Sequence, residues 1–158
     1  MRKRIKDHIE NCITCLLANA SQHGNEGEMQ IVSVASAPLK TMHVDNFGSL
    51  QPSDEGYKYI LVVVDAFTRF SWLFPSRTTG TRKTYKLMRM IFDVFGAPNC
   101  LVSDRGTAFT SSEFAEFMKE YQINHQKVVV AAPWANGIAE RVNRFLKSSL
   151  SRTTEKAD

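Results

Sequence analysis

The sequence predicts an α/β fold in which a five-stranded mixed sheet is flanked by helices. Three segments with strand character follow one another between residues 41 and 77, and helix then alternates with strand to about residue 150. Strands joined by tight turns pair in antiparallel fashion, whereas strands joined through a helix pair in parallel. The chain has 158 residues, 43% of them hydrophobic, which is enough for one domain with a proper core.

The first half of the domain is predicted to form three strands and a helix. Residues 41–50 (TMHVDNFGSL) read as a strand that ends at a Gly-Ser turn, and residues 57–70 carry a continuous apolar run typical of a strand buried on both faces. Residues 71–77 (SWLFPSR) make the third strand. Apolar residues recur at helical spacing in residues 81–95, and the sequence GAPN that follows is a helix stop.

The second half is predicted to alternate two strands with two helices. Residues 100–104 (CLVSD) form a short strand, after which Thr110 and Glu113 fit a capping box that starts a helix. Residues 125–132 (HQKVVVAA) form the last strand. The closing helix is expected to begin at about Asn136, a good N-cap residue, and to fray in the polar final segment.

Composition narrows the class of protein. Lys and Arg total 20 against 16 acidic residues, and the net charge of +4 is compatible with a polyanionic partner without proving one. No signal peptide or membrane-spanning segment is recognisable, so we expect a soluble intracellular chain. The odd count of three cysteines predicts no disulfide framework.

Residues 21–37 are rich in small polar residues and read as a linker before a main domain over residues 38–158.

Three acidic residues are candidates for a metal site. Asp45 is expected to end or nearly end the first strand, Asp104 ends the fourth, and Glu140 lies in the closing helix. If the two strands are neighbours, their carboxylates converge at the carboxyl edge of the sheet, and the chain can return Glu140 to the same edge. Carboxylate oxygens are the ligands that Mg²⁺ prefers, and two such ions about 3.5 to 4 Å apart can clamp a phosphodiester displacement.

Each of these acids also has an ordinary structural interpretation. Asp45 could cap a turn, Asp104 precedes Arg-Gly in a common turn motif, and Glu140 could pair with Arg144 one helical turn away. Asp65 ends an apolar strand in the same way as Asp45. Spacing alone does not choose between Asp45 and Asp65.

Taken together, four motifs resemble the catalytic core of retroviral and LTR-retrotransposon integrases, and among these most resemble the integrases of Gypsy-type or Pao-type elements. The motifs are HVDNFG, VVVDAFTRF, VSDRGTAFTS and PWANGIAERVNRFLK, and they span roughly residues 38–150 in that order. The resemblance implies a ribonuclease H-like fold. It further implies that Asp45, Asp104 and Glu140 bind two Mg²⁺ or Mn²⁺ ions, and that Asp65 is not a ligand.

The resemblance also implies an activity, partners and a location. Such enzymes trim the 3′ end of the element's DNA with water and then join the exposed 3′-hydroxyl to target DNA, as homo-oligomers and in the nucleus. A polar stripe around Glu140 would then meet DNA, although an exposed helix face is the plainer interpretation. The stripe comprises Asn136, Asn143, Arg144 and Lys147. The alternative function is a decayed or domesticated fragment that binds nucleic acid without catalysis.

Both ends of the chain depart from the family pattern. Cys12 and Cys15 are similar to the second half of the family's His-His-Cys-Cys zinc module, so residues 1–20 read as a remnant of it. His8 lies too close to Cys12 to replace the missing histidine pair, and a tetrahedral site needs four ligands, so we expect no zinc here. The core is expected to be truncated after its last helix, which puts the activity in doubt but not the fold.

Overall fold

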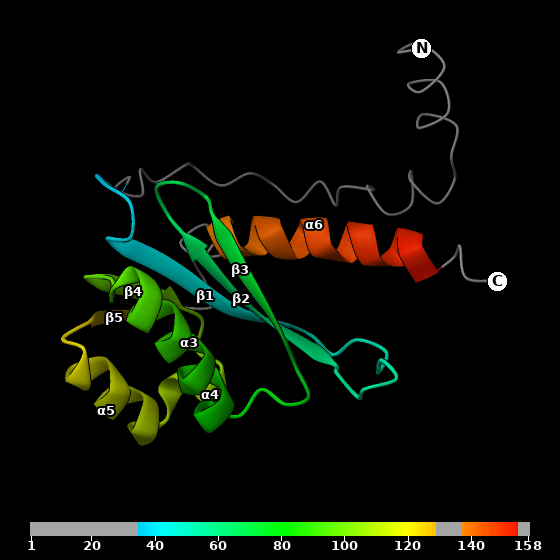
Figure 1. Ribbon diagram of the computed structural model, residues 1–158, viewed down its shortest axis with the longest axis horizontal. Helices are drawn as coiled ribbons and strands as arrows, with labels where there is room; N and C mark the ends of the chain where they lie inside the picture. The colour runs from blue at the N-terminus through cyan, green and yellow to red at the C-terminus, as the bar shows by residue number, and fades with distance from the viewer. Residues whose placement is uncertain (1–34, 129–136, 155–158) are drawn as a thin grey trace, which may run out of the picture. The chain divides into compact units, whose positions relative to one another are not determined.

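The computed structural model describes residues 35–128 and 137–154 (Figure 1). Cys12, Cys15 and Asn136, with most of the predicted linker, lie outside these ranges. The chain falls into two compact units, and the unit Ile31–Glu140 contains the whole sheet, whereas residues from Arg141 onward belong to the other unit. The sheet and the greater part of the last helix are therefore described separately.

Five strands form one mixed sheet in the order β3-β2-β1-β4-β5 (Figure 1). Their bounds are β1 Thr41–Gly48, β2 Tyr59–Asp65, β3 Ser71–Ser76, β4 Cys100–Ser103 and β5 Asn124–Lys127. β1 pairs with β2 and β2 with β3 in antiparallel fashion, while β4 pairs in parallel with both β1 and β5. The predicted antiparallel and parallel halves are thus confirmed.

The helices agree with prediction except around residue 110. Their bounds are α3 Thr81–Phe95, α4 Thr107–Thr110, α5 Ser112–Glu120 and α6 Gly137–Thr154. The predicted capping box is wrong, because Thr110 closes the one-turn helix α4 and Ser111 is the N-cap of α5, accepting a hydrogen bond from Phe114 N at 3.2 Å. α3 ends before Gly96, as predicted. Gly96 has a positive φ of 87°, which glycine tolerates, and its N–H donates a hydrogen bond to Phe92 O.

The core lies between one face of the sheet and the helices α3 and α5. Apolar side chains of three adjacent strands pack against both helices; they are Met42 and Val44 of β1, Leu61 and Val63 of β2, and Leu101 of β4. Because strand side chains alternate, His43 and Asp45 of β1 belong to the opposite face. The packing of α3 and α5 therefore decides which face of the sheet carries the candidate acid.

Asp65 connects the end of β2 to two other backbone segments. The side chain is fully buried, and its Oδ1 accepts a hydrogen bond from Leu39 N at 2.9 Å. Oδ2 accepts from Thr68 N at 2.8 Å and from Thr68 Oγ1 at 2.5 Å. Burial acts to raise the pKa of Asp65, but the hydrogen bonds from Thr68, Leu39 and Phe67 together lower it below its ordinary value of 3.8. Asp65 is thus a structural carboxylate.

We expect Asp65→Asn to lower the free energy of unfolding by about 3 kcal/mol at neutral pH, because the amide places an N–H against buried donors. Because the pKa of Asp65 is lower in the folded chain, its carboxylate stabilises the fold at every pH above its pKa in the unfolded chain. This stabilisation is lost as the pH falls through the pKa of Asp65 in the folded chain. The difference between variant and wild type should therefore shrink in acid. Urea unfolding measures it, with Asp93→Asn, exposed on α3, as the control; equal losses in both variants would contradict the role of Asp65.

Candidate functional site

Asp45 and Asp104 lie at the same level of two adjacent parallel strands. Val44 of β1 pairs with Ser103 of β4, and each aspartate is the next residue in the chain, Asp45 within β1 and Asp104 just beyond the end of β4. Asp45 lies in the second half of β1, which continues to Gly48, next to the predicted Gly-Ser turn. β1 extends this far because its antiparallel partner β2 pairs with it as far as Gly48, whereas β4 stops at Ser103.

Asp104 begins the turn that follows β4, and hydrogen bonds hold it at two points. Its Oδ1 accepts from Gly106 N at 2.9 Å, and its carbonyl oxygen accepts from Ser103 Oγ at 2.8 Å. A Cβ atom on Gly106 would lie 3.0 Å from the same Oδ1, so glycine permits this close approach. The Asp104 side chain is exposed, while Asp45 is half-buried and accepts from Asn46 N at 2.7 Å.

Glu140, the third predicted acid, is exposed in the first turn of α6. Within residues 35–128 and 137–154, no three side chains of His, Cys, Asp or Glu gather closely enough to hold a metal ion. The structure therefore brings Asp45 and Asp104 to adjacent positions and does not add Glu140 to them. Residues 129–136, which connect β5 to α6, lie outside the described ranges, and the metal-binding role of Glu140 stays a prediction.

The predicted polar stripe occupies one side of α6. Glu140, Arg144 and Lys147 are spaced by four and three residues, so they project from the same helix face, and all three are exposed. Asn143 is half-buried. Two cations next to an acid on an exposed face have the chemistry needed to contact phosphate near a carboxylate site.

His125 of β5 is a site-adjacent residue that the sequence analysis missed. Its Nε2 lies 2.9 Å from Ser103 Oγ, and its ring packs edge-to-face on Phe114 with centroids 5.2 Å apart. Burial, with a smaller contribution from the charge of Lys127, lowers the pKa of His125 to about 4. The ring is therefore neutral at neutral pH. The polar strand NHQK shows no apolar pattern that would have identified it.

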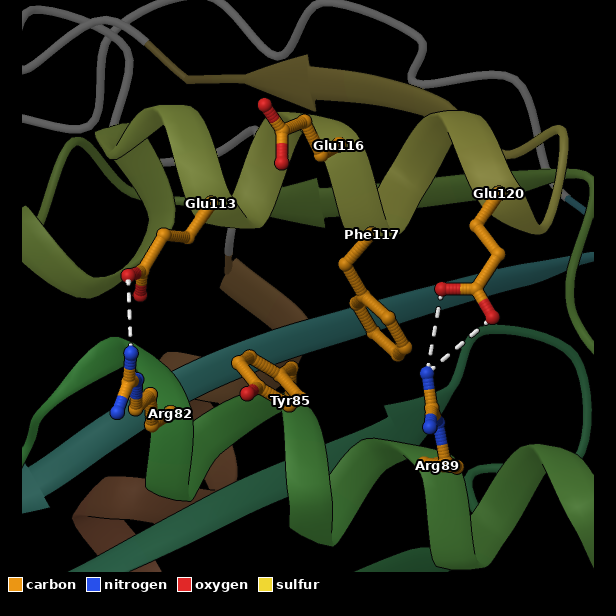
Figure 2. A pocket seen from close by; sticks show the side chains of 7 residues that line it. All are labelled: Arg82, Tyr85, Arg89, Glu113, Glu116, Phe117 and Glu120. Carbon is orange, nitrogen blue, oxygen red and sulfur yellow. Dashed lines mark hydrogen bonds and ion pairs between the residues drawn. The ribbon is translucent and has the colours of Figure 1, made fainter.

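A cleft of about 330 Å³ lies between α3 and α5, away from the candidate acids, and is lined by residues of these two helices (Figure 2). Arg82 reaches Glu113 at 3.8 Å and Arg89 reaches Glu120 at 3.2 Å, with Tyr85 and Phe117 between the two ion pairs. The Arg89 guanidinium also lies 5.8 Å from the centre of the Phe117 ring. No predicted site residue lines the cleft. Two ion pairs cross it, so we interpret its side chains as contacts that hold α3 against α5.

The described part of the chain offers no helix with the length and apolar character needed to cross a membrane.

Comparisons with known proteins identify a family. The integrase core domain family matches residues 35–133. The chain is 34% identical over 152 residues to the Pro-Pol polyprotein of Feline foamy virus, covering 96% of this chain and 13% of that protein. It is 39% identical over 110 residues to the Pro-Pol polyprotein of Simian foamy virus type 1, covering 70% of this chain and 9% of that protein. The Transposon Tf2-3 polyprotein of Schizosaccharomyces pombe is 26% identical over 152 residues, covering 95% and 11%. The chain thus spans only a small part of the length of these relatives.

Two solved structures share the fold. One is the simian T-cell lymphotropic virus intasome in complex with the PP2A regulatory subunit B56 gamma, with a TM-score of 0.67, 19% identity, and 99% of this chain and 55% of that chain covered. The other is the HTLV-2 integrase catalytic core domain in complex with magnesium, with a TM-score of 0.59, 24% identity, and 76% and 74% covered. The predicted ribonuclease H-like fold is therefore confirmed.

We expect the His125 ring to titrate near pH 4, as its lowered pKa of about 4 indicates. An unfolded histidine titrates near pH 6.5, so between these values the folded chain binds fewer protons than the unfolded chain, by about one. The stability that this residue contributes is therefore complete above the unfolded value and is lost as the pH falls toward 4. NMR titration of the ring protons gives the pKa, and His125→Gln should remove this part of the pH dependence of unfolding. A pKa at the ordinary value would contradict the buried environment.

Proposed function

The chain belongs to the integrase core family of retroviral and retrotransposon polyproteins, and we propose that it is the core of an integrase-type polynucleotidyl transferase acting in DNA integration. One structural observation carries this proposal. Asp45 in β1 and Asp104 directly after β4 each follow the paired residues Val44 and Ser103 of two adjacent parallel strands, and carboxylates from separate parts of the sequence can share a cation at such a place.

The residues present fit a hard divalent cation. Asp45 and Asp104 offer carboxylate oxygens, and Asp104 Oδ2 makes no hydrogen bond to the described residues. We propose that these two and Glu140 hold Mg²⁺ or Mn²⁺. Bound at this place, a pair of such ions would polarise a phosphodiester and stabilise the charge that develops on the attacking and leaving oxygens. A similar core domain was solved with magnesium.

The chain's own contribution to the reaction is to place the DNA. Asn136, Asn143, Arg144 and Lys147 are proposed to contact backbone phosphates and end bases next to Glu140. In 3′-end processing, water attacks a phosphorus atom and the bond from phosphorus to the 3′-oxygen of the retained strand breaks, which exposes a 3′-hydroxyl and releases the terminal nucleotides with a 5′-phosphate. In strand transfer, the freed 3′-hydroxyl attacks a target phosphodiester and the target strand's 3′-oxygen leaves. The partners are the element's ends and target DNA, in the nucleus.

The similar solved structures also motivate an oligomer. The HTLV-2 core was solved in dimeric and trimeric forms, and the simian virus protein was solved as an intasome. We therefore include a homo-oligomer in the proposal.

The second candidate function is a nucleic-acid-binding fragment without catalysis. It is favoured by the exposed cationic side chains of Arg144 and Lys147 on α6, which can contact phosphate without a bound metal ion. Such a fragment would bind DNA in a salt-sensitive manner through its cationic residues and would be indifferent to the loss of Glu140.

We expect millimolar Mn²⁺ or Mg²⁺ to raise the unfolding temperature of the wild type by about 3 °C, because a ligand that binds only the folded state stabilises it. Asp104→Asn should abolish this shift. Differential scanning fluorimetry with and without metal measures it, and Asp93→Asn, which removes an equal charge from an exposed position on α3, should keep the full shift. No shift in the wild type would refute the metal site.

We expect Arg144→Ala and Lys147→Ala each to weaken binding of an end-shaped DNA duplex and to reduce the salt slope of log K by about one phosphate contact. Fluorescence anisotropy over a salt series measures both quantities. Arg82→Ala, which removes the same charge from the exposed surface of α3, is the matched control. Strand transfer on oligonucleotide ends then separates the two functions: an integrase core loses it in Glu140→Gln, whereas a mere binding fragment shows none.

A further inference from the structure

Ser103 is a fully buried hydroxyl next to the candidate metal ligand Asp104. It is the last residue of β4, and its Oγ lies 2.8 Å from the carbonyl oxygen of Asp104 and 2.9 Å from Nε2 of His125. A hydroxyl has one proton to donate, and the carbonyl oxygen can only accept it. His125 must therefore donate from Nε2 to Ser103 Oγ, so this neutral ring carries its hydrogen on Nε2.

The His125 ring is itself fixed from the helical layer. Leu101 of β4 pairs with His125 of β5, which places the histidine on the core face of the sheet, and Phe114 of α5 packs against the ring. A continuous series of contacts therefore leads from α5 through His125 and Ser103 to the backbone of Asp104. An apolar pair would fill the same space without the cost of burying the Ser103 hydroxyl and half-burying the His125 imidazole, so these hydrogen bonds call for an explanation.

Asp104 is consequently held at both ends. Ser103 fixes its carbonyl oxygen, and Gly106 N fixes its carboxylate through Oδ1. Together these bonds set the direction in which the remaining carboxylate oxygen, Oδ2, is presented.

We propose that Ser103 and His125 are positioning residues that hold Asp104 in the orientation required to bind a divalent cation. This inference rests on the proposed function, because it assigns the two residues to the same metal site. Groups that hydrogen-bond behind a metal ligand commonly change metal affinity by about 10-fold to 100-fold when they are removed.

The test compares Mn²⁺ affinity, measured by calorimetry, across two matched pairs of variants. Ser103→Ala should weaken binding by about tenfold. Ser76→Ala should leave it unchanged, although Ser76 is an equally buried strand-end serine that donates to Thr78 O at 2.6 Å. His125→Phe keeps the ring contact with Phe114 and loses the N–H, so it should also weaken binding. His125→Gln keeps a donor at the same reach and should restore most of the affinity.

A second measurement needs no metal. Ser103→Ala should accelerate hydrogen exchange of the Gly106 amide in the metal-free chain. That amide donates to the Asp104 carboxylate, and the substitution removes the hydrogen bond that holds the Asp104 carbonyl oxygen. Wild-type affinity in Ser103→Ala would overturn the inference. Failure of the wild type to bind Mn²⁺ would instead refute the proposed function, and unchanged Gly106 exchange would then overturn the positioning role as well.

Discussion

The parallel pairing of β1 with β4 is the constraint on which both the core and the candidate site depend. Its register aligns Met42 with Leu101 and Val44 with Ser103, and the apolar members of these pairs face α3 and α5. Strand side chains alternate, so the same register fixes Asp45 on the opposite face, beside the turn that carries Asp104. A slip of one residue would turn Asp45 toward the core and expose Val44. Core burial therefore fixes the relative positions of the two acids.

The two aspartates are nevertheless held by different means. Asp45 lies inside a strand whose backbone pairs with Val62 of β2, and its position is set by the sheet. Asp104 lies where β4 has ended, so its position depends on the hydrogen bonds of a turn. One candidate ligand is thus part of a sheet strand, and the position of the other depends on the residues that hydrogen-bond to the turn. This difference is why the buried hydroxyl of Ser103 matters for the position of Asp104, whereas the sheet itself sets the position of Asp45.

The features predicted from sequence are those with a strong local signal. The apolar run of β2 and the helical spacing of α3 with its Gly96 stop were confirmed because pattern and packing agree there. The N-cap of α5 was misplaced because Thr110 and Ser111 are both good caps, and only the extra turn of α4 decides between them. His125 was missed because Ser103 and Phe114, the residues that its ring contacts, are distant in the sequence. The role of Glu140 stays a prediction that depends on the family resemblance, since its local sequence is that of an ordinary surface helix.

Asp65 shows which carboxylates of this sheet are available for chemistry. It ends an apolar strand, as a catalytic acid of this fold could, yet three donors from Leu39 and Thr68 occupy both of its oxygens in a fully buried position. A cation could take those oxygens only by displacing the bonds that hold two backbone segments to β2. Asp104 instead commits one oxygen to Gly106 and exposes its side chain. The sequence pattern at the two positions is similar, and the number of N–H and O–H groups facing each carboxylate is what separates the structural acid from the candidate ligand.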